Sequence, residues 1–132
     1  LLNKKTMEDT RITFETAKLA KEKGFPQEPN RLKIPYYNYK GEFKGDVKDW
    51  LRKYLRKEDT SDVESVSAPT QSLLAKWLRE EHNIHLIAYK NINIDGYDWC
   101  YITTDGITNI NSYKTYEEAY EIGLQEALKY IS

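Results

Sequence analysis

The run KWLREEHNIHLIAY, residues 76–89, holds both histidines of the chain, His82 and His85, directly after two acids, Glu80 and Glu81. Imidazole and carboxylate groups so close in sequence could bind a metal ion or exchange protons with a substrate. A zinc site needs three or four ligands that converge on one point, and the two histidines fall on either side of an expected helix end. The His-Glu-x-x-His spacing does not occur. We therefore expect His82 to favour the end of a helix and His85 to lie in a strand, with no metal bound.

The remaining residue types that support catalysis do not form a known arrangement. The single cysteine, Cys100, excludes an internal disulfide and a four-cysteine zinc site, and it lies mid-strand between Trp99 and Tyr101, where it should pack as a small apolar residue. Neither a Gly-x-Ser-x-Gly motif nor a phosphate-binding glycine loop occurs. We predict a protein that is not an enzyme, with no catalytic residue and no cofactor.

A basic helix is the strongest functional indication in the sequence. Residues 45–58 place apolar side chains on one stripe of period 3.6, and the opposite face is cationic. This face could contact phosphates, anionic lipid or an acidic protein surface, or it could be a solvated face matched by the acidic C-terminal helix. The predicted binding surface consists of Lys48, Arg52, Lys53, Arg56 and Lys57.

The elements before residue 69 are predicted as short pieces. Residues 13–25 read as a helix with Thr13 as its N-cap and Gly24 at its left-handed end. Residues 34–43 read as a short strand or an aromatic-rich extended loop. The polar run 59–67 lacks periodicity and is predicted to be a mobile loop.

The second half of the chain has a clearer order. Pro69 suits the first turn of a helix that ends at Asn83, in the left-handed conformation. Strands are predicted from residue 84, over 97–104 and over 107–113, separated by turns at 93–96 and 105–106. A helix over 115–131 closes the chain, with a capping box and small residues at 119, 123 and 127 that permit close approach to a sheet. In the helix that ends at Asn83, the side chains expected to be buried are Leu73, Leu74, Trp77 and Leu78.

These elements predict an α+β fold. A three-stranded antiparallel sheet packs against helices, with helix–β–β–β–helix order in residues 67–132. The length of 132 residues suits a single domain over 1–132, in which 1–10 are disordered or a remnant of upstream sequence. The net charge of −1 does not favour binding of nucleic acid by bulk charge, and no apolar run reaches transmembrane length. We expect a cytoplasmic protein that does not bind membranes.

The chain also resembles a family. The runs SAPTQSLLAKWLREEHNIHL, TYEEAYEIGLQEALKYI and TFETAKLAKEKGF are similar to small hypothetical proteins encoded by phages and integrated mobile elements of Bacteroides-type gut bacteria. The similarity covers about half of the chain and leaves out residues 43–66. It implies an accessory protein of a mobile element, and it supplies no catalytic residues.

Two functions follow as hypotheses. The first is a non-enzymatic protein-binding module whose partner is a host or phage protein, because the chain is rich in Tyr and Trp, which suit binding surfaces. The alternative is a nucleic-acid-binding protein that uses the basic helix 45–58. The oligomeric state is left open by the sequence.

Overall fold

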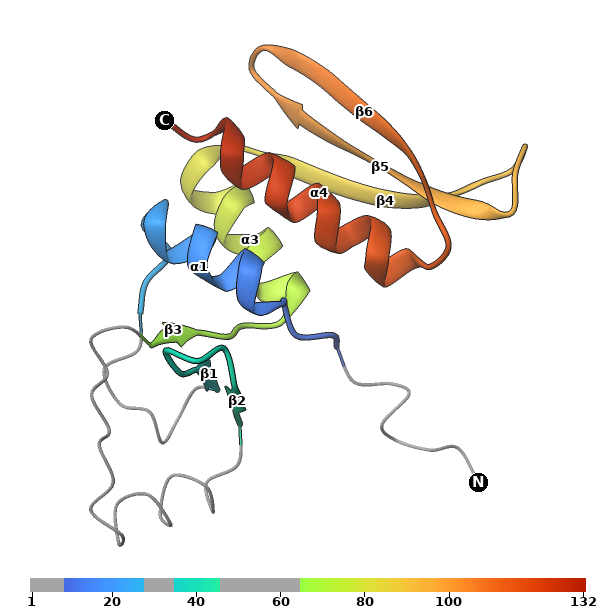
Figure 1. The fold of residues 1–132 in the computed structure, drawn as a ribbon. Coiled ribbons are helices and arrows are strands. Elements are labelled where there is room, and N and C mark those ends of the chain that lie inside the picture. Colours follow the sequence, from blue (N-terminus) through green and yellow to red (C-terminus); the bar gives the residue numbers. More distant parts are fainter. Residues whose placement is uncertain (1–8, 28–34, 46–64) are drawn as a thin grey trace, which may run out of the picture. The chain divides into compact units, whose positions relative to one another are not determined.

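A computed structural model describes residues 9–27, 35–45 and 65–132 (Figure 1). The chain divides into two compact units. The hairpin unit comprises Ile12–Pro69, and the sheet unit comprises Thr70–Ser132 together with Leu1–Arg11. The single domain expected from the sequence stays a prediction.

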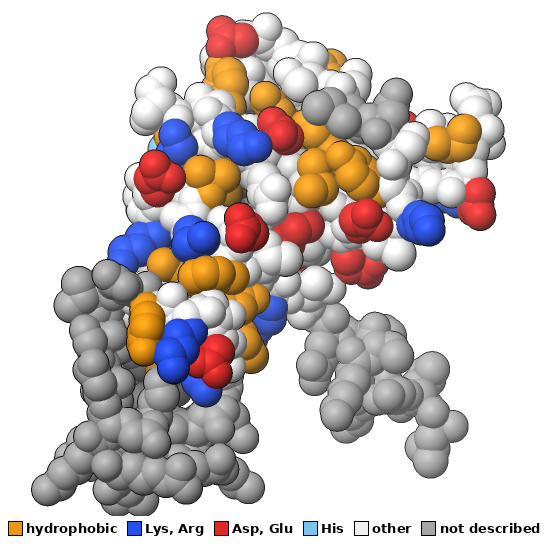
Figure 2. All heavy atoms as spheres, viewed as in Figure 1, with side chains coloured by type: hydrophobic (Ala, Val, Ile, Leu, Met, Phe, Trp, Pro, Cys, Tyr) orange, Lys and Arg blue, Asp and Glu red, His pale blue; other side chains and the backbone are white. Residues whose placement is uncertain are grey.

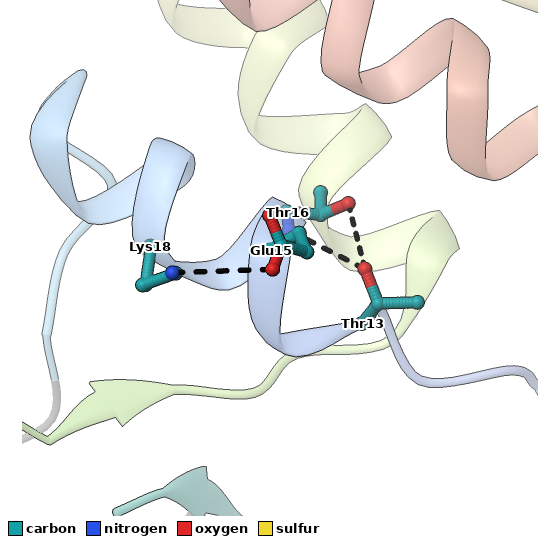
Figure 3. Close-up of polar contacts among 4 residues, drawn as sticks. All are labelled: Thr13, Glu15, Thr16 and Lys18. Carbon is teal, nitrogen blue, oxygen red and sulfur yellow. Dashed lines mark hydrogen bonds and ion pairs between the residues drawn. The ribbon is translucent and has the colours of Figure 1, made fainter. Parts of the chain in front are cut away.

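Helix α1, Phe14–Glu22, opens the hairpin unit and lies within the range 13–25 that the sequence predicts. The side chain of Thr13 caps it, since Thr13 Oγ1 accepts a hydrogen bond from the backbone N–H of Thr16 at 3.3 Å. Figure 3 shows this cap beside the ion pair between Lys18 Nζ and Glu15 Oε1, which are 4.0 Å apart. Gly24 has a φ of 100° and supplies the left-handed residue after the helix, as predicted.

Residues 34–43 are predicted as a short strand or an extended loop, and the described residues from 35 onward form a tight β-hairpin. Strand β1, Tyr36–Tyr37, pairs antiparallel with β2, Phe43–Lys44, and on its other side with β3, Val66–Ser67. Asn38 shapes the turn because its Oδ1 accepts hydrogen bonds from the backbone N–H groups of Lys40, at 3.0 Å, and Glu42, at 2.9 Å.

The loop predicted over 59–67 does not extend to residue 67. Val66 and Ser67 form β3, and Ser65, Val66 and Ser67 are all buried. The backbone N–H of Ser67 donates to Gln27 Oε1 at 2.8 Å, a tertiary bond that local sequence does not announce. Residues 59–64 lie outside the described residues.

Helix α3, Gln71–His82, begins the sheet unit, and its ends are set by local capping. The N-cap is Thr70, whose Oγ1 accepts from the backbone N–H of Leu73 at 3.2 Å, so Pro69 stands before the cap rather than in the first turn. Asn83 ends the helix at a φ of 53°, in the left-handed conformation that the sequence predicts.

The predicted buried stripe of α3 is wrong in two of its four positions. Leu74 and Leu78 are fully buried, but Leu73 is 47% exposed and Trp77 is only half-buried. The buried face is rotated toward Gln71 and Ala75. Gln71 is held there by its side chain: Nε2 donates to the Glu117 carbonyl and to Glu121 Oε1, both at 3.0 Å.

Three antiparallel strands follow in the order β4-β5-β6, which confirms the predicted sheet. They are β4, His85–Asn91, β5, Gly96–Thr103, and β6, Gly106–Tyr113. The register between β5 and β6 shifts between Tyr97, which pairs with Tyr113, and Trp99, which pairs with Ile110. Strand β6 therefore carries one extra residue, a β-bulge, and Ser112 in it has a φ of 124°.

Helix α4, Tyr116–Tyr130, packs against β4 and β5 (Figure 1). The side chain of Thr115 caps it, as predicted, by accepting from the backbone N–H of Glu118 at 3.1 Å. The small residues Ala119, Gly123 and Ala127 are buried. A Cβ atom on Gly123 would lie 2.7 Å from Leu86 Cδ1, so the helix lies as close to the sheet as the sequence predicts. The fold is α+β, with the predicted helix–β–β–β–helix order.

Candidate binding surface

The basic surface predicted from the sequence lies outside the described residues. All five of its members, Lys48, Arg52, Lys53, Arg56 and Lys57, fall within 46–64. The binding role of this surface stays a prediction.

The two histidines lie in separate environments. The ring of His82 packs edge-on against Trp77, with ring centroids 4.7 Å apart, at the end of α3. His85 is exposed at the start of β4, and its Nε2 lies 3.0 Å from Asn83 Oδ1. In the described parts of the chain, no three His, Cys, Asp or Glu side chains come together as a metal site would require.

Cys100 is half-buried in β5, beside Ile87 in the neighbouring strand. Burial raises the pKa of its thiol from an ordinary value near 9.0. The nucleophile is the thiolate, so this environment disfavours nucleophilic chemistry at neutral pH.

One face of the sheet, the inner face, is covered by α4 and lined by aromatic rings. Trp99 is fully buried and stacks on Tyr101, with centroids 5.7 Å apart and planes at 6°. Tyr101 in turn meets Tyr130 of α4 at 6.0 Å, and Tyr97 meets Tyr116 at 6.1 Å. Most of the aromatic richness of β5 is therefore used for packing.

Two tyrosines on α4 have perturbed acidity. Burial raises the pKa of Tyr116, with smaller contributions from the charges of Glu117 and Asp9. Burial also raises the pKa of Tyr120, and neighbouring Tyr116 adds to the shift. Both phenols therefore stay protonated in the folded unit at a pH where a free tyrosine begins to ionise.

The opposite face of the sheet, the outer face, presents apolar side chains to solvent. Leu86 and Trp99 lie against Gly123 of α4, so the alternating residues on either side of them point away from the helix. Ile87 is 46% exposed, Tyr89 40% and Ile107 64%. We define the outer face by the residues that the pairing register places in neighbouring positions: His85, Ile87, Tyr89, Asp98, Cys100, Ile102, Ile107 and Asn109.

The outer face is nearly uncharged. Its two ionisable groups besides the cysteine and tyrosine are His85, which is exposed, and Asp98, which is buried. Asp98 Oδ2 accepts a hydrogen bond from Asn91 Nδ2 at 2.9 Å, while Oδ1 has no hydrogen-bond partner among the described residues. The face thus offers isoleucine and tyrosine contacts with little charge.

Further apolar side chains are exposed at the turn between β4 and β5. Ile92 is 92% exposed and Ile94 44%. In the view of Figure 2, hydrophobic side chains are exposed between charged side chains of both signs.

None of the described helices α1, α3 and α4 has the length and apolar composition needed to cross a membrane.

Sequence reasoning did not single out Ile87, Tyr89 or Ile107. The signal was nevertheless present: the strand IHLIAYKN is apolar at consecutive positions, where a strand with one solvated face normally alternates. On a strand whose other face packs against α4, such a run leaves apolar side chains exposed on the second face.

The chain matches no protein-family model, no curated protein sequence and no solved structure. The resemblance to proteins of phages and mobile elements stays a prediction.

Proposed function

We propose that this chain is a non-enzymatic protein-binding module, an accessory protein of a mobile element that binds a host or phage protein through the outer face of the β4–β6 sheet. The observation that carries the proposal is the exposure of Ile87, Tyr89 and Ile107 on one face. A helix-covered sheet normally turns polar side chains to water on its other face, so exposed isoleucines there favour a contact surface.

The chemistry of the face favours a protein over a nucleic acid. Nucleic-acid affinity comes mainly from lysine and arginine that neutralise phosphates, and the outer face, as defined above, has neither. Tyrosine and exposed aliphatic residues with few charges are typical of the centre of a protein–protein interface. A partner should therefore offer an apolar patch, and its binding should depend weakly on salt.

The experiment uses the full chain as bait and a single substitution, Ile87→Glu. A carboxylate placed at the centre of an apolar contact must be desolvated on binding, so retention of a specific partner should fall at least tenfold. The matched control is Ile92→Glu, which makes the same change at a more exposed isoleucine in the turn, off the outer face. Partner retention by this control should equal that of the wild type.

Three results would contradict the proposal. The first is a partner retained equally by the wild type and Ile87→Glu. The second is a partner lost equally from both variants. The third is retention that disappears after nuclease treatment or falls steeply with salt, which would favour nucleic-acid binding through the basic helix 45–58 instead.

A further inference from the structure

Strand β6 is an edge of the sheet. In the described part of the chain it pairs with β5 on one side, and residues 106–109 are exposed to solvent. The backbone N–H and C=O groups on the other side of such a strand are able to pair with another strand.

The edge lacks the usual protection against pairing. Natural edge strands carry lysine, proline or inward-pointing charges that prevent the addition of another strand. Residues 106–110 read GITNI and contain no charge and no proline. Protection begins only after them, at the bulge, where Ser112 has a φ of 124° and ends the regular ladder. The segment available for pairing is therefore five residues long.

We propose that two copies of this chain pair antiparallel through residues 106–110 of β6, about a two-fold axis at Thr108. In this register Thr108 lies opposite Thr108 of the second copy, and Ile107 lies opposite Asn109. The two three-stranded sheets join into one sheet of six strands. The proposal rests on the backbone edge of β6 and not on the proposed function. The two surfaces share Ile107, whereas Ile87 and Tyr89 belong to β4, at the far edge of the sheet.

Charge and symmetry favour a second copy as the occupant. Two-fold pairing of a strand with itself places identical residues near each other, and like charges in opposed positions are destabilising. A segment with no charge avoids this penalty, and threonine pairs are favourable across strands. Ile107, which is 64% exposed, also lies diagonal to its own copy, so both isoleucines lose contact with water.

The packing of α4 leaves space for the second copy. This helix contacts β4 and β5 more extensively than β6. With strands about 4.8 Å apart, the two α4 axes would be separated by roughly 19 Å, more than the diameter of about 10–12 Å of a helix with its side chains. The pairing segment is short, so the dimer should be weak and should form only at high protein concentration.

The test measures the association of the full chain by analytical ultracentrifugation, with charges of either sign introduced at Thr108. Thr108→Lys places two ammonium groups opposite each other in the dimer, and Thr108→Glu two carboxylates. Each variant alone should dissociate roughly five to ten times more readily than the wild type. An equimolar mixture of the two should recover association, because lysine then faces glutamate. Asn93→Lys in the turn between β4 and β5 adds the same charge elsewhere and should associate like the wild type.

The position is exposed, so both variants should keep the far-UV circular dichroism of the wild type. A wild type that stays monomeric up to about 1 mM overturns the proposal, since the weakest specific contacts are populated at that concentration. Variants that associate as the wild type does, or a mixture that associates no better than either variant alone, place any dimer on another surface.

Discussion

The close approach of α4 to the sheet can be tested through Gly123. Replacing glycine by alanine inside a helix normally stabilises it by about 1 kcal/mol. Here the new Cβ would lie 2.7 Å from Leu86 Cδ1 and 3.2 Å from Trp99 Cγ. Carbon atoms in ordinary contact are about 3.5–4.0 Å apart, and overpacking of a core costs about 1–3 kcal/mol. Gly123→Ala should therefore destabilise the folded chain by about 1 kcal/mol, despite the gain in helix propensity.

The source of this cost is separable by a double-mutant cycle. Leu86→Val removes the atom that makes the closest contact, and it leaves the contact with Trp99, which requires a shift of only a few tenths of an ångström. In the Leu86→Val background, Gly123→Ala should be less destabilising by about 1 kcal/mol, since its closest clash is gone. Denaturation by urea, followed by far-UV circular dichroism, gives the four free energies of unfolding that the cycle needs.

The matched control is Ile87→Val, one residue further along β4 and on the outer face. It should not couple to Gly123→Ala, because independent sites add within about 0.3–0.5 kcal/mol. A coupling energy below that limit for Leu86→Val would mean that its terminal methyl group moves aside and that the cost arises at Trp99. An equal coupling for Ile87→Val would refute the packing of α4 on the side of the sheet that Leu86 occupies. The assignment of the outer face would then fail with it.

Two further predictions concern the aromatic residues. Trp99→Ala should lower the free energy of unfolding by about 3–5 kcal/mol, because the Trp99 side chain is fully buried. Trp77→Ala, at a half-buried site, should lower it by about half as much. Equal losses measured by urea denaturation would contradict this order. Burial raises the pKa values of Tyr116 and Tyr120, so above pH 10 the folded chain binds more protons than the unfolded chain. The stability that these tyrosines contribute below pH 10 should therefore be lost as the pH rises through their raised pKa values. Tyr120→Phe should reduce this alkaline loss, measured by thermal melting at pH 9 to 12, and a variant as pH-sensitive as the wild type would exclude Tyr120 as a source.

The sequence predicts those features of the fold that depend on neighbouring residues. The caps Thr13 and Thr115 and the left-handed Asn83 act within one turn of their own helix, so their sequence signals are complete. The rotation of α3 could not be predicted in this way. Gln71 is buried because its amide meets Glu121, a residue 50 positions away, and a polar residue with a distant partner reads as exposed when the sequence is considered alone.

The candidate surface was less predictable than the fold. The sequence drew attention to cations on 45–58, since charge is visible in any window of a sequence. The exposed Ile87 and Ile107 look identical to core residues until the position of α4 assigns one face of the sheet to the interior. Exposure of an apolar side chain is a property of the layers, and only the assembled sheet and helix define it.

The hydrogen bond between Gln71 and Glu121 has a consequence for the order in which the sheet unit forms. Its two residues are 50 positions apart, whereas each hairpin of the sheet closes through a turn of a few residues. The entropic cost of closing a loop rises with its length, and hairpins form within about 1–10 μs. The paired strands also fix where the helices attach: α3 leads into His85, level with Ile107, and α4 follows Tyr113 at the other end of β6. The sheet thus anchors both helices before the start of α3 meets α4, and we expect the bond between Gln71 and Glu121 to form late in the folding of this unit.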